Sequence, residues 1–176
     1  MKQEPLFENK NGSLFSLKTG RAYDTHAVVR VDTRTLSVQM LASKEFAQQY
    51  SACAPGLLGV CVPWKTVALS DGAFNEEYLA ALREFLKNTE AMELGAVIIP
   101  EPDGAALEPY TTAMVHTARR IKDCASVAGF AFPWEFAGNA DAVASCIAAL
   151  SVKHPGYVYF SPEHTGNVQL IPYQMR

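Results

Sequence analysis

Several features that would assign this chain to a particular class of protein are missing from its sequence. Its Lys and Arg residues form no basic stripe or run, so we expect no nucleic-acid partner. The longest apolar runs are far shorter than the ~20 residues that cross a bilayer, so we expect no membrane contact either. The opening stretch, MKQEPLFENKNG, is polar and has no apolar core, so we expect no signal peptide.

Motifs of common cofactor and nucleophile sites are missing as well. The chain has no Gly-x-Gly-x-x-Gly or P-loop pattern for a nucleotide and no G-x-S-x-G elbow for a hydrolase. Its cysteines form no C-x-x-C pair, and none stands near a histidine at zinc-ligand spacing; they are Cys53, Cys61, Cys124 and Cys146. We interpret them as buried free thiols of a reducing, cytoplasmic compartment, and we expect neither a cofactor nor a metal. A catalytic Cys–His pair is the alternative, without local support.

The composition that is present fits one folded domain. The chain has 176 residues, a formal net charge of −3 and 49% hydrophobic residues, which allows a substantial core and excludes disorder. We expect a single domain over residues 1–176. Within it, N-terminal strands are expected over 1–42, βα repeats over 43–163 and a C-terminal strand over 164–176.

From residue 56 onward, an apolar stretch, a polar loop and an amphipathic helix alternate. Continuous apolar runs of this length are typical of strands that are covered on both faces. They predict strands over residues 56–64, 96–100, 127–134 and 157–161. Periodic apolar positions predict helices that begin at the capping residue Asn75 and that cover about 110–123 and 141–152.

The two ends of the chain are less regular. The N-terminal third alternates apolar and polar residues over 13–23 and 26–41, which predicts a hairpin or meander. A helix over about 43–53, capped by Ser43, is expected next; a wholly helical stretch over 35–53 is the alternative. Residues 168–173 read as an edge strand, because Pro172 within them cannot donate to a sheet ladder.

Alternating strands and helices predict a parallel sheet with right-handed crossovers. A complete eight-stranded α/β barrel typically has about 250 residues, which leaves an open doubly wound sheet or a partial barrel. We expect an α/β fold with an incomplete, TIM-barrel-like parallel sheet (a half-barrel), flanking helices and extra N-terminal strands. The edges of such a sheet invite pairing, so we expect either a homodimer or another protein partner, or coverage by the N-terminal strands.

Four of the predicted strands end alike, in VCVPWK, VIIPEPD, AFPWEF and YFSPEH. Since parallel strands point the same way, the residues that follow the prolines gather on one rim. Glutamates stand there three times, as Glu101, Glu135 and Glu163. Two carboxyl groups are what sugar cleavage requires, and tryptophan offers a flat apolar face to a sugar ring. The alternative is a set of solvent-exposed glutamates without function.

The order of these pieces resembles the family 5 glycoside hydrolases, which are cellulase-like (β/α)8 enzymes. The similarity covers about residues 56–163. GLLGVCVPWKTVALSDGAFNEEYLAALREFL resembles the early strand with its Arg-x-Pro pattern, loop and helix, and AVIIPEPDG takes the place of the next strand. TARRIKDCASVAGFAFPWEF is similar to the helix and strand that lead to the Asn-Glu-Pro motif. The resemblance implies that Glu135 is the acid/base.

This chain departs from that family at several positions. Cys61 and Val62 stand where the family has arginine, Trp134 replaces the asparagine before the acid/base, and Phe136 replaces the proline after it. The family's nucleophile lies on a late strand, and this sequence stops before one.

Two functions follow as hypotheses. The first, which we favour, is a non-catalytic barrel-derived protein that binds a carbohydrate-like ligand or a protein partner at the rim. Its ligand-binding residues would be Trp64, Trp134, Asp103 and His164. The second is a glycoside hydrolase with Glu135 as acid/base and Glu101 or Glu163 as the second carboxylate. A metal site built from Glu135, Glu163 and His164 is a weaker alternative.

Overall fold

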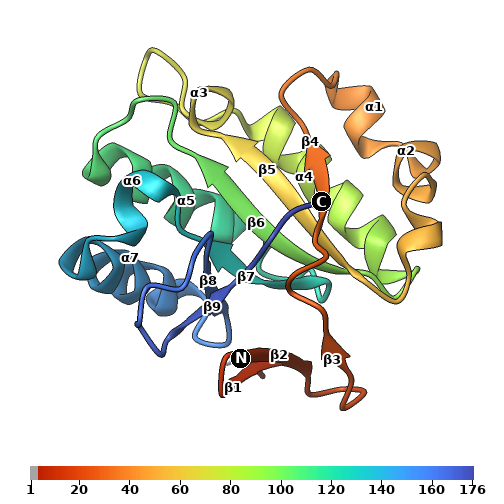
Figure 1. The fold of residues 1–176 in the computed structure, drawn as a ribbon. Helices are drawn as coiled ribbons and strands as arrows, with labels where there is room; N and C mark the ends of the chain where they lie inside the picture. The colour runs from red at the N-terminus through yellow and green to blue at the C-terminus, as the bar shows by residue number, and fades with distance from the viewer. Residues whose placement is uncertain (1–3) are drawn as a thin grey trace.

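The fold is organised around one six-stranded parallel sheet, which the computed structural model describes together with the rest of residues 4–176 (Figure 1). The strands are β4 (Val29–Asp32), β5 (Leu57–Pro63), β6 (Gly95–Glu101), β7 (Val127–Ala131), β8 (Val158–Ser161) and β9 (Leu170–Pro172). They lie side by side in chain order, and every neighbouring pair is parallel. A doubly wound sheet would reverse its order at a switch point, so the predicted α/β fold with an incomplete barrel-like sheet is confirmed.

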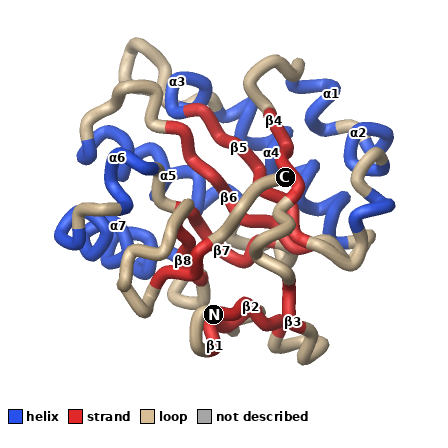
Figure 2. Tube along the Cα trace, viewed as in Figure 1, coloured by secondary structure: helices blue, strands red, loops and turns tan. Residues whose placement is uncertain are grey.

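Helices cover the outer face of this sheet (Figure 2). The longer ones are α4 (Glu76–Glu90), α5 (Leu107–Ile121) and α7 (Ala140–Lys153). Shorter segments are α1 (Val38–Ala42), α2 (Lys44–Gln48), the 3₁₀ turn Ser51–Cys53, α3 (Trp64–Val67) and α6 (Trp134–Ala137). The expected cap of α4 is confirmed, because the Asn75 side chain accepts a hydrogen bond from the Tyr78 N–H at 3.1 Å. Among the described residues, no helix has the length and apolar character needed to cross a membrane.

The N-terminal segment forms a separate antiparallel sheet. Its strands are β1 (Phe7–Lys10), β2 (Ser13–Ser16) and β3 (Ala22–Tyr23), paired in that order as the predicted meander. The prediction that the second β-like stretch continues to residue 41 is wrong at its end, because Val38–Ala42 form helix α1. Ser37 caps this helix by accepting from the Met40 N–H, and Leu41 is its buried residue. Leu36, Val38 and Met40 alternate like strand residues, yet Met40 is exposed.

Strands β5 to β9 each contribute to two cores. On β5, Leu58, Val60 and Val62 pack against the helices, whereas Leu57 and Cys61 belong to a second cluster inside the curved sheet. Gly59 also faces inward, where a Cβ would stand 2.7 Å from Ile99 Cδ1. Because β5 is buried on both faces, its positions read as a continuous apolar run.

The N-terminal sheet closes one end of the inner core. Phe7 and Leu14 belong to the inner cluster, and both are buried. The sheet lies where the parallel strands begin, since a Cβ on Gly95, the first residue of β6, would stand 3.5 Å from the Tyr23 ring. The N-terminal strands therefore cover the inner face of the barrel-like sheet at that end, as one of our two expectations proposed.

The two edges of the parallel sheet also meet, so the expectation of open edges is wrong. Residues 173–176 leave β9 and pair with residues 25–28, which lead into β4 (Figure 1). The Gln174 N–H donates to Thr25 O at 2.8 Å, and the Val28 N–H donates to Gln174 O at 3.0 Å. The homodimer stays a prediction, but open sheet edges no longer support it.

A buried histidine makes the stability of the fold depend on pH. His154 stacks on Tyr157 with ring centroids 3.8 Å apart, and its Nδ1 is buried without a hydrogen-bond partner among the described residues. Burial disfavours the imidazolium and lowers the pKa of His154 below its ordinary value. Below about pH 6.5 this histidine is protonated in the unfolded chain but stays neutral in the folded chain. The free energy of unfolding is therefore retained above about pH 6.5 and falls as the pH decreases toward the lowered pKa of His154.

We expect the melting temperature of the wild type to fall between about pH 7.5 and about pH 5 by more than that of a His154→Phe variant, because only the wild type contains this histidine. The phenylalanine keeps the stacking on Tyr157 and removes the titrating group. Thermal melts followed by circular dichroism over this range measure the difference. Parallel pH profiles for the two proteins would show that His154 contributes nothing to the acid sensitivity.

Candidate functional site

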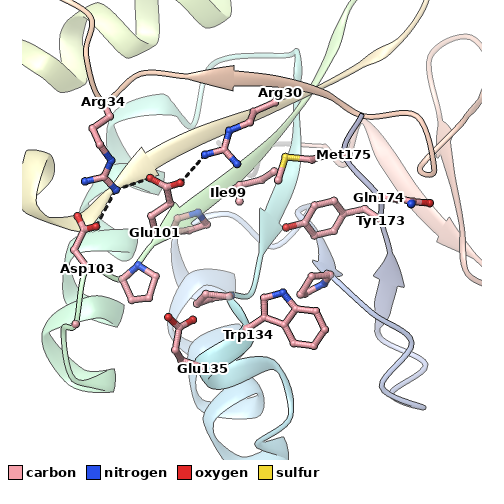
Figure 3. Close-up of a pocket in the computed structure, with 15 residues that line it drawn as sticks. Arg30, Arg34, Ile99, Glu101, Asp103, Trp134, Glu135, Tyr173, Gln174 and Met175 are labelled. Atoms are coloured by element: carbon pink, nitrogen blue, oxygen red, sulfur yellow. Dashed lines mark hydrogen bonds and ion pairs between the residues drawn. The ribbon is translucent and has the colours of Figure 1, made fainter.

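A cleft of about 630 Å³ opens where the parallel strands end (Figure 3). Its walls come from the ends of β4 and β6 and from the segments that follow β6, β7, β8 and β9. The side chains on which its chemistry depends are Arg30, Arg34, Glu101, Asp103, Trp134 and Tyr173, with Glu135 beside the tryptophan. This is the end of an α/β barrel at which ligands are usually bound.

One wall of the cleft is an ion network centred on Glu101, the last residue of β6. Arg30 Nη2 donates to Glu101 Oε1 at 3.0 Å, and Arg34 Nη2 donates to Glu101 Oε2 at 2.7 Å. Arg30 lies in β4 between Val29 and Val31, so strand alternation turns it toward the inside of the barrel. Both oxygens of one carboxylate are therefore held by guanidinium groups from the neighbouring part of the sheet.

Asp103 extends this network and fixes its geometry. Its Oδ1 accepts from Arg34 Nη2 at 2.8 Å, and its Oδ2 accepts from the Lys65 backbone N–H at 3.1 Å. The residue itself has a left-handed backbone, with φ +52°, and Gly104 follows with φ +85°. The hydrogen bonds that Arg34 donates to Asp103 and to Glu101 raise the pKa of Arg34, so this guanidinium stays charged.

The opposite wall carries a tryptophan and a carboxylate with few contacts. Both belong to α6, which begins directly after Pro133 at the end of the β7 region. Trp134 is 62% exposed and is the most exposed aromatic side chain in the described part of the chain. Glu135 is exposed as well, and its carboxylate forms no hydrogen bond or ion pair with any residue of 4–176. Both side chains are therefore available to a ligand.

Four of the residues selected from the sequence thus line one cleft, namely Glu101, Asp103, Trp134 and Glu135. Trp64 lies elsewhere: it is half-buried at the start of α3, packs against the outer core and donates from Nε1 to Pro109 O at 3.2 Å. This contact turns its indole away from the cleft.

Glu163 and His164 do not line the cleft either, although Pro162 just before them does. Glu163 is exposed, and its backbone oxygen accepts from the Ser161 hydroxyl. His164 borders a separate hollow beside Asn9, where its Nδ1 accepts from the Gly166 N–H at 3.3 Å. The three residues of the alternative metal site are therefore not gathered in one place. Within residues 4–176, no group of three or more His, Cys, Asp or Glu side chains is arranged to hold a metal.

Sequence reasoning missed three side chains of the cleft: Arg30, Arg34 and Tyr173. The sequence offered one indication of Arg30, because charged residues alternate with valines in VRVD, residues 29–32. The same alternation is typical of an ordinary half-exposed strand, so it did not identify a site residue. Tyr173 follows β9, and its hydroxyl points toward the middle of the cleft (Figure 3). Burial raises the pKa of Tyr173 to about 12, so its hydroxyl remains protonated at neutral pH.

Comparison with known proteins supports the fold and goes no further. No family model matches the chain, and no curated protein sequence matches it. The GH5_18 structure from Streptomyces cattleya in complex with GlcNAc is similar, with a TM-score of 0.55 and 9% identity over 80% of this chain and 45% of that one. A GH5_18 structure from Bifidobacterium longum subsp. infantis is also similar, with a TM-score of 0.54 and 9% identity. That match covers 79% of this chain and 43% of the other.

The chain therefore spans less than half the length of these relatives. At this level of identity the likeness concerns the fold alone. The resemblance to family 5 glycoside hydrolases noted in the sequence is confirmed in that limited sense: this chain has a fold similar to part of these glycoside hydrolase structures.

Proposed function

We propose that this protein binds a carbohydrate-like ligand in the cleft at the strand ends and does not cleave it. The exposed indole of Trp134 beside a network of charged hydrogen-bonding groups carries the proposal. A sugar ring has an apolar C–H face, which an indole covers, and a rim of hydroxyls, which carboxylates and guanidinium groups bind. The cleft provides both kinds of surface on facing walls.

The network of the polar wall suits recognition because it is already ordered. Glu101 and Asp103 accept hydrogen bonds from arginines, so their positions are set before a ligand arrives. Arg30 is still 44% exposed at its side chain and has further N–H groups for a hydroxyl. A prearranged site loses less conformational entropy on binding.

A hydrolase with Glu135 as acid/base is the second candidate, because Glu135 and Glu101 line the same cleft. Glu163, the other partner we considered, lies outside it. A catalytic carboxylic acid usually lies in buried surroundings, whereas Glu135 is exposed to solvent. This difference favours binding without turnover.

Titration with a β-1,4-linked glucose tetrasaccharide, followed by tryptophan fluorescence and calorimetry, tests the proposal. We expect Trp134→Ala to weaken binding about five- to thirtyfold, since an aromatic contact of this kind is worth about 1–2 kcal/mol. Trp64→Phe is the matched control, because the only other tryptophan of the chain lies outside the cleft, and it should leave the affinity unchanged.

Three results would count against this proposal. Equal affinity in the wild type and Trp134→Ala would remove Trp134 from the site. Lack of binding by the wild type would contradict carbohydrate recognition of this class. Release of reducing ends by the wild type that disappears in Glu135→Gln would establish the hydrolase instead.

A further inference from the structure

We propose that the ligand carries a protonated amine, with Glu135 binding the ammonium group while Trp134 stacks on the sugar ring that bears it. This inference rests on the proposed function and narrows it to amino sugars with a free amine. It follows from the distribution of charge within the cleft.

The charges of the two walls differ. On one wall, the carboxylates of Glu101 and Asp103 face the guanidinium groups of Arg30 and Arg34, with N–O distances of 2.7–3.0 Å. On the other wall, Glu135 has no cationic partner among the described residues. One negative charge of the cleft is thus left for a ligand to compensate.

The neighbours of Glu135 suit a cation better than a neutral group. Trp134 precedes it on α6, and the negative face of an indole attracts a cation within about 6 Å of its ring. In Figure 3 both side chains lie on the same wall, with the Trp134 indole extending toward Tyr173 and the Glu135 carboxylate to its other side. The remaining aromatic group of the cleft, Tyr173, presents a neutral hydroxyl and no competing positive charge.

An anionic ligand fits this arrangement poorly. Both arginines of the cleft already pair with carboxylates that offset their positive charges, so an incoming anion would find no uncompensated cation there. It would also meet the uncompensated charge of Glu135 on the opposite wall. Like charges brought together in a cleft oppose binding, which excludes acidic sugars as the preferred ligand.

Three tetrasaccharides with the same β-1,4 linkage test the inference, since they differ only at the second carbon: one carries free amines, one N-acetyl groups and one hydroxyls. Calorimetry is run at mildly acidic pH and low salt, above the ordinary carboxyl pKa of about 4.3, where the amines are protonated. We expect the amine form to bind about tenfold more tightly than the hydroxyl form, as a partly desolvated charge pair predicts.

The Glu135→Gln variant should bind the amine and hydroxyl forms within about twofold of each other, because the amide has no charge to pair with the ammonium. Glu163→Gln is the matched control: it removes an exposed glutamate outside the cleft and should keep the full preference. Added salt should reduce the preference of the wild type and leave that of Glu135→Gln unchanged.

The outcomes separate the inference from the function on which it rests. Equal binding of all three sugars, or a preference that survives in Glu135→Gln, overturns the role of Glu135 while carbohydrate binding stands. Tighter binding of the N-acetyl form contradicts the preference for a free amine and shows that the cleft recognises the acetamido group instead. Absence of binding for every sugar overturns the proposed function itself.

Discussion

A single methyl group at position 129 is expected to destroy most of the stability of this protein. Gly129 lies in the middle of β7, in register with Val158 of β8. A Cβ at this position would stand 1.6 Å from the Val158 backbone oxygen and 2.7 Å from its carbonyl carbon. Because these are backbone atoms of a paired strand, no side-chain rotation relieves the overlap. The Gly129→Ala variant can fold only if β7 and β8 separate locally.

We expect Gly129→Ala to lower the free energy of unfolding by more than about 3 kcal/mol, at the upper end of what overpacking costs. Urea unfolding followed by circular dichroism measures the change. The control is Gly138→Ala at the end of α6, where no atom lies within 4 Å of the added Cβ. That variant should stay within about 0.5 kcal/mol of the wild type. Equal midpoints for the two variants would contradict the close approach of β7 and β8.

The second large effect is expected where the sheet closes on itself. In Gln174→Pro the backbone loses the N–H that donates to Thr25 O at 2.8 Å. The pairing of residues 173–176 with residues 25–28 then loses one of its few bonds, and Thr25 O is left without this donor. We expect the free energy of unfolding to fall by about 2 kcal/mol, the sum of a lost hydrogen bond and an unsatisfied acceptor.

The same change should weaken ligand binding, because Tyr173 and Met175 form a wall of the cleft and flank the substituted residue. Urea unfolding and sugar titration are measured side by side. Gln174→Ala keeps the backbone N–H and removes an exposed side chain that borders the cleft, so it should resemble the wild type in the unfolding assay. If the proline variant is as stable as the alanine variant, the closure seen here does not contribute to stability.

The sequence predicted the buried part of the sheet well. Strands β5 to β8 are covered on both faces, so nearly every residue in them is apolar and their positions stand out. Strand β4 was placed with the N-terminal meander instead. Its Arg30 and Asp32 face the mouth of the barrel, so the strand alternates like one that borders solvent. Only its parallel pairing with β5, about thirty residues away, distinguishes the two cases.

Only part of the candidate site could be predicted, because some of its residues come from β4 or directly follow it, and the local pattern does not show the place of this strand in the sheet. That Glu101 and Trp134 share a rim follows from the common direction of parallel strands alone. Trp64, which also follows a proline, turns away because Pro109 accepts its indole N–H, and this contact joins residues far apart in the chain. The cationic partners of Glu101 come from a strand that was assigned elsewhere. Local pattern therefore identified the carboxylates of the cleft and missed the arginines.

The closure of the sheet has a consequence for the order in which this protein is made. Residues 25–28 leave the ribosome early, yet their strand partners, 173–176, are added after every other residue that the structure describes. Until then β4 has only one neighbour, and the cleft lacks the wall that contains Tyr173. The outer helices can pack during synthesis, because they contact helices and strands that are close to them in the chain. The candidate site, in contrast, is completed only after residues 173–176 have been translated.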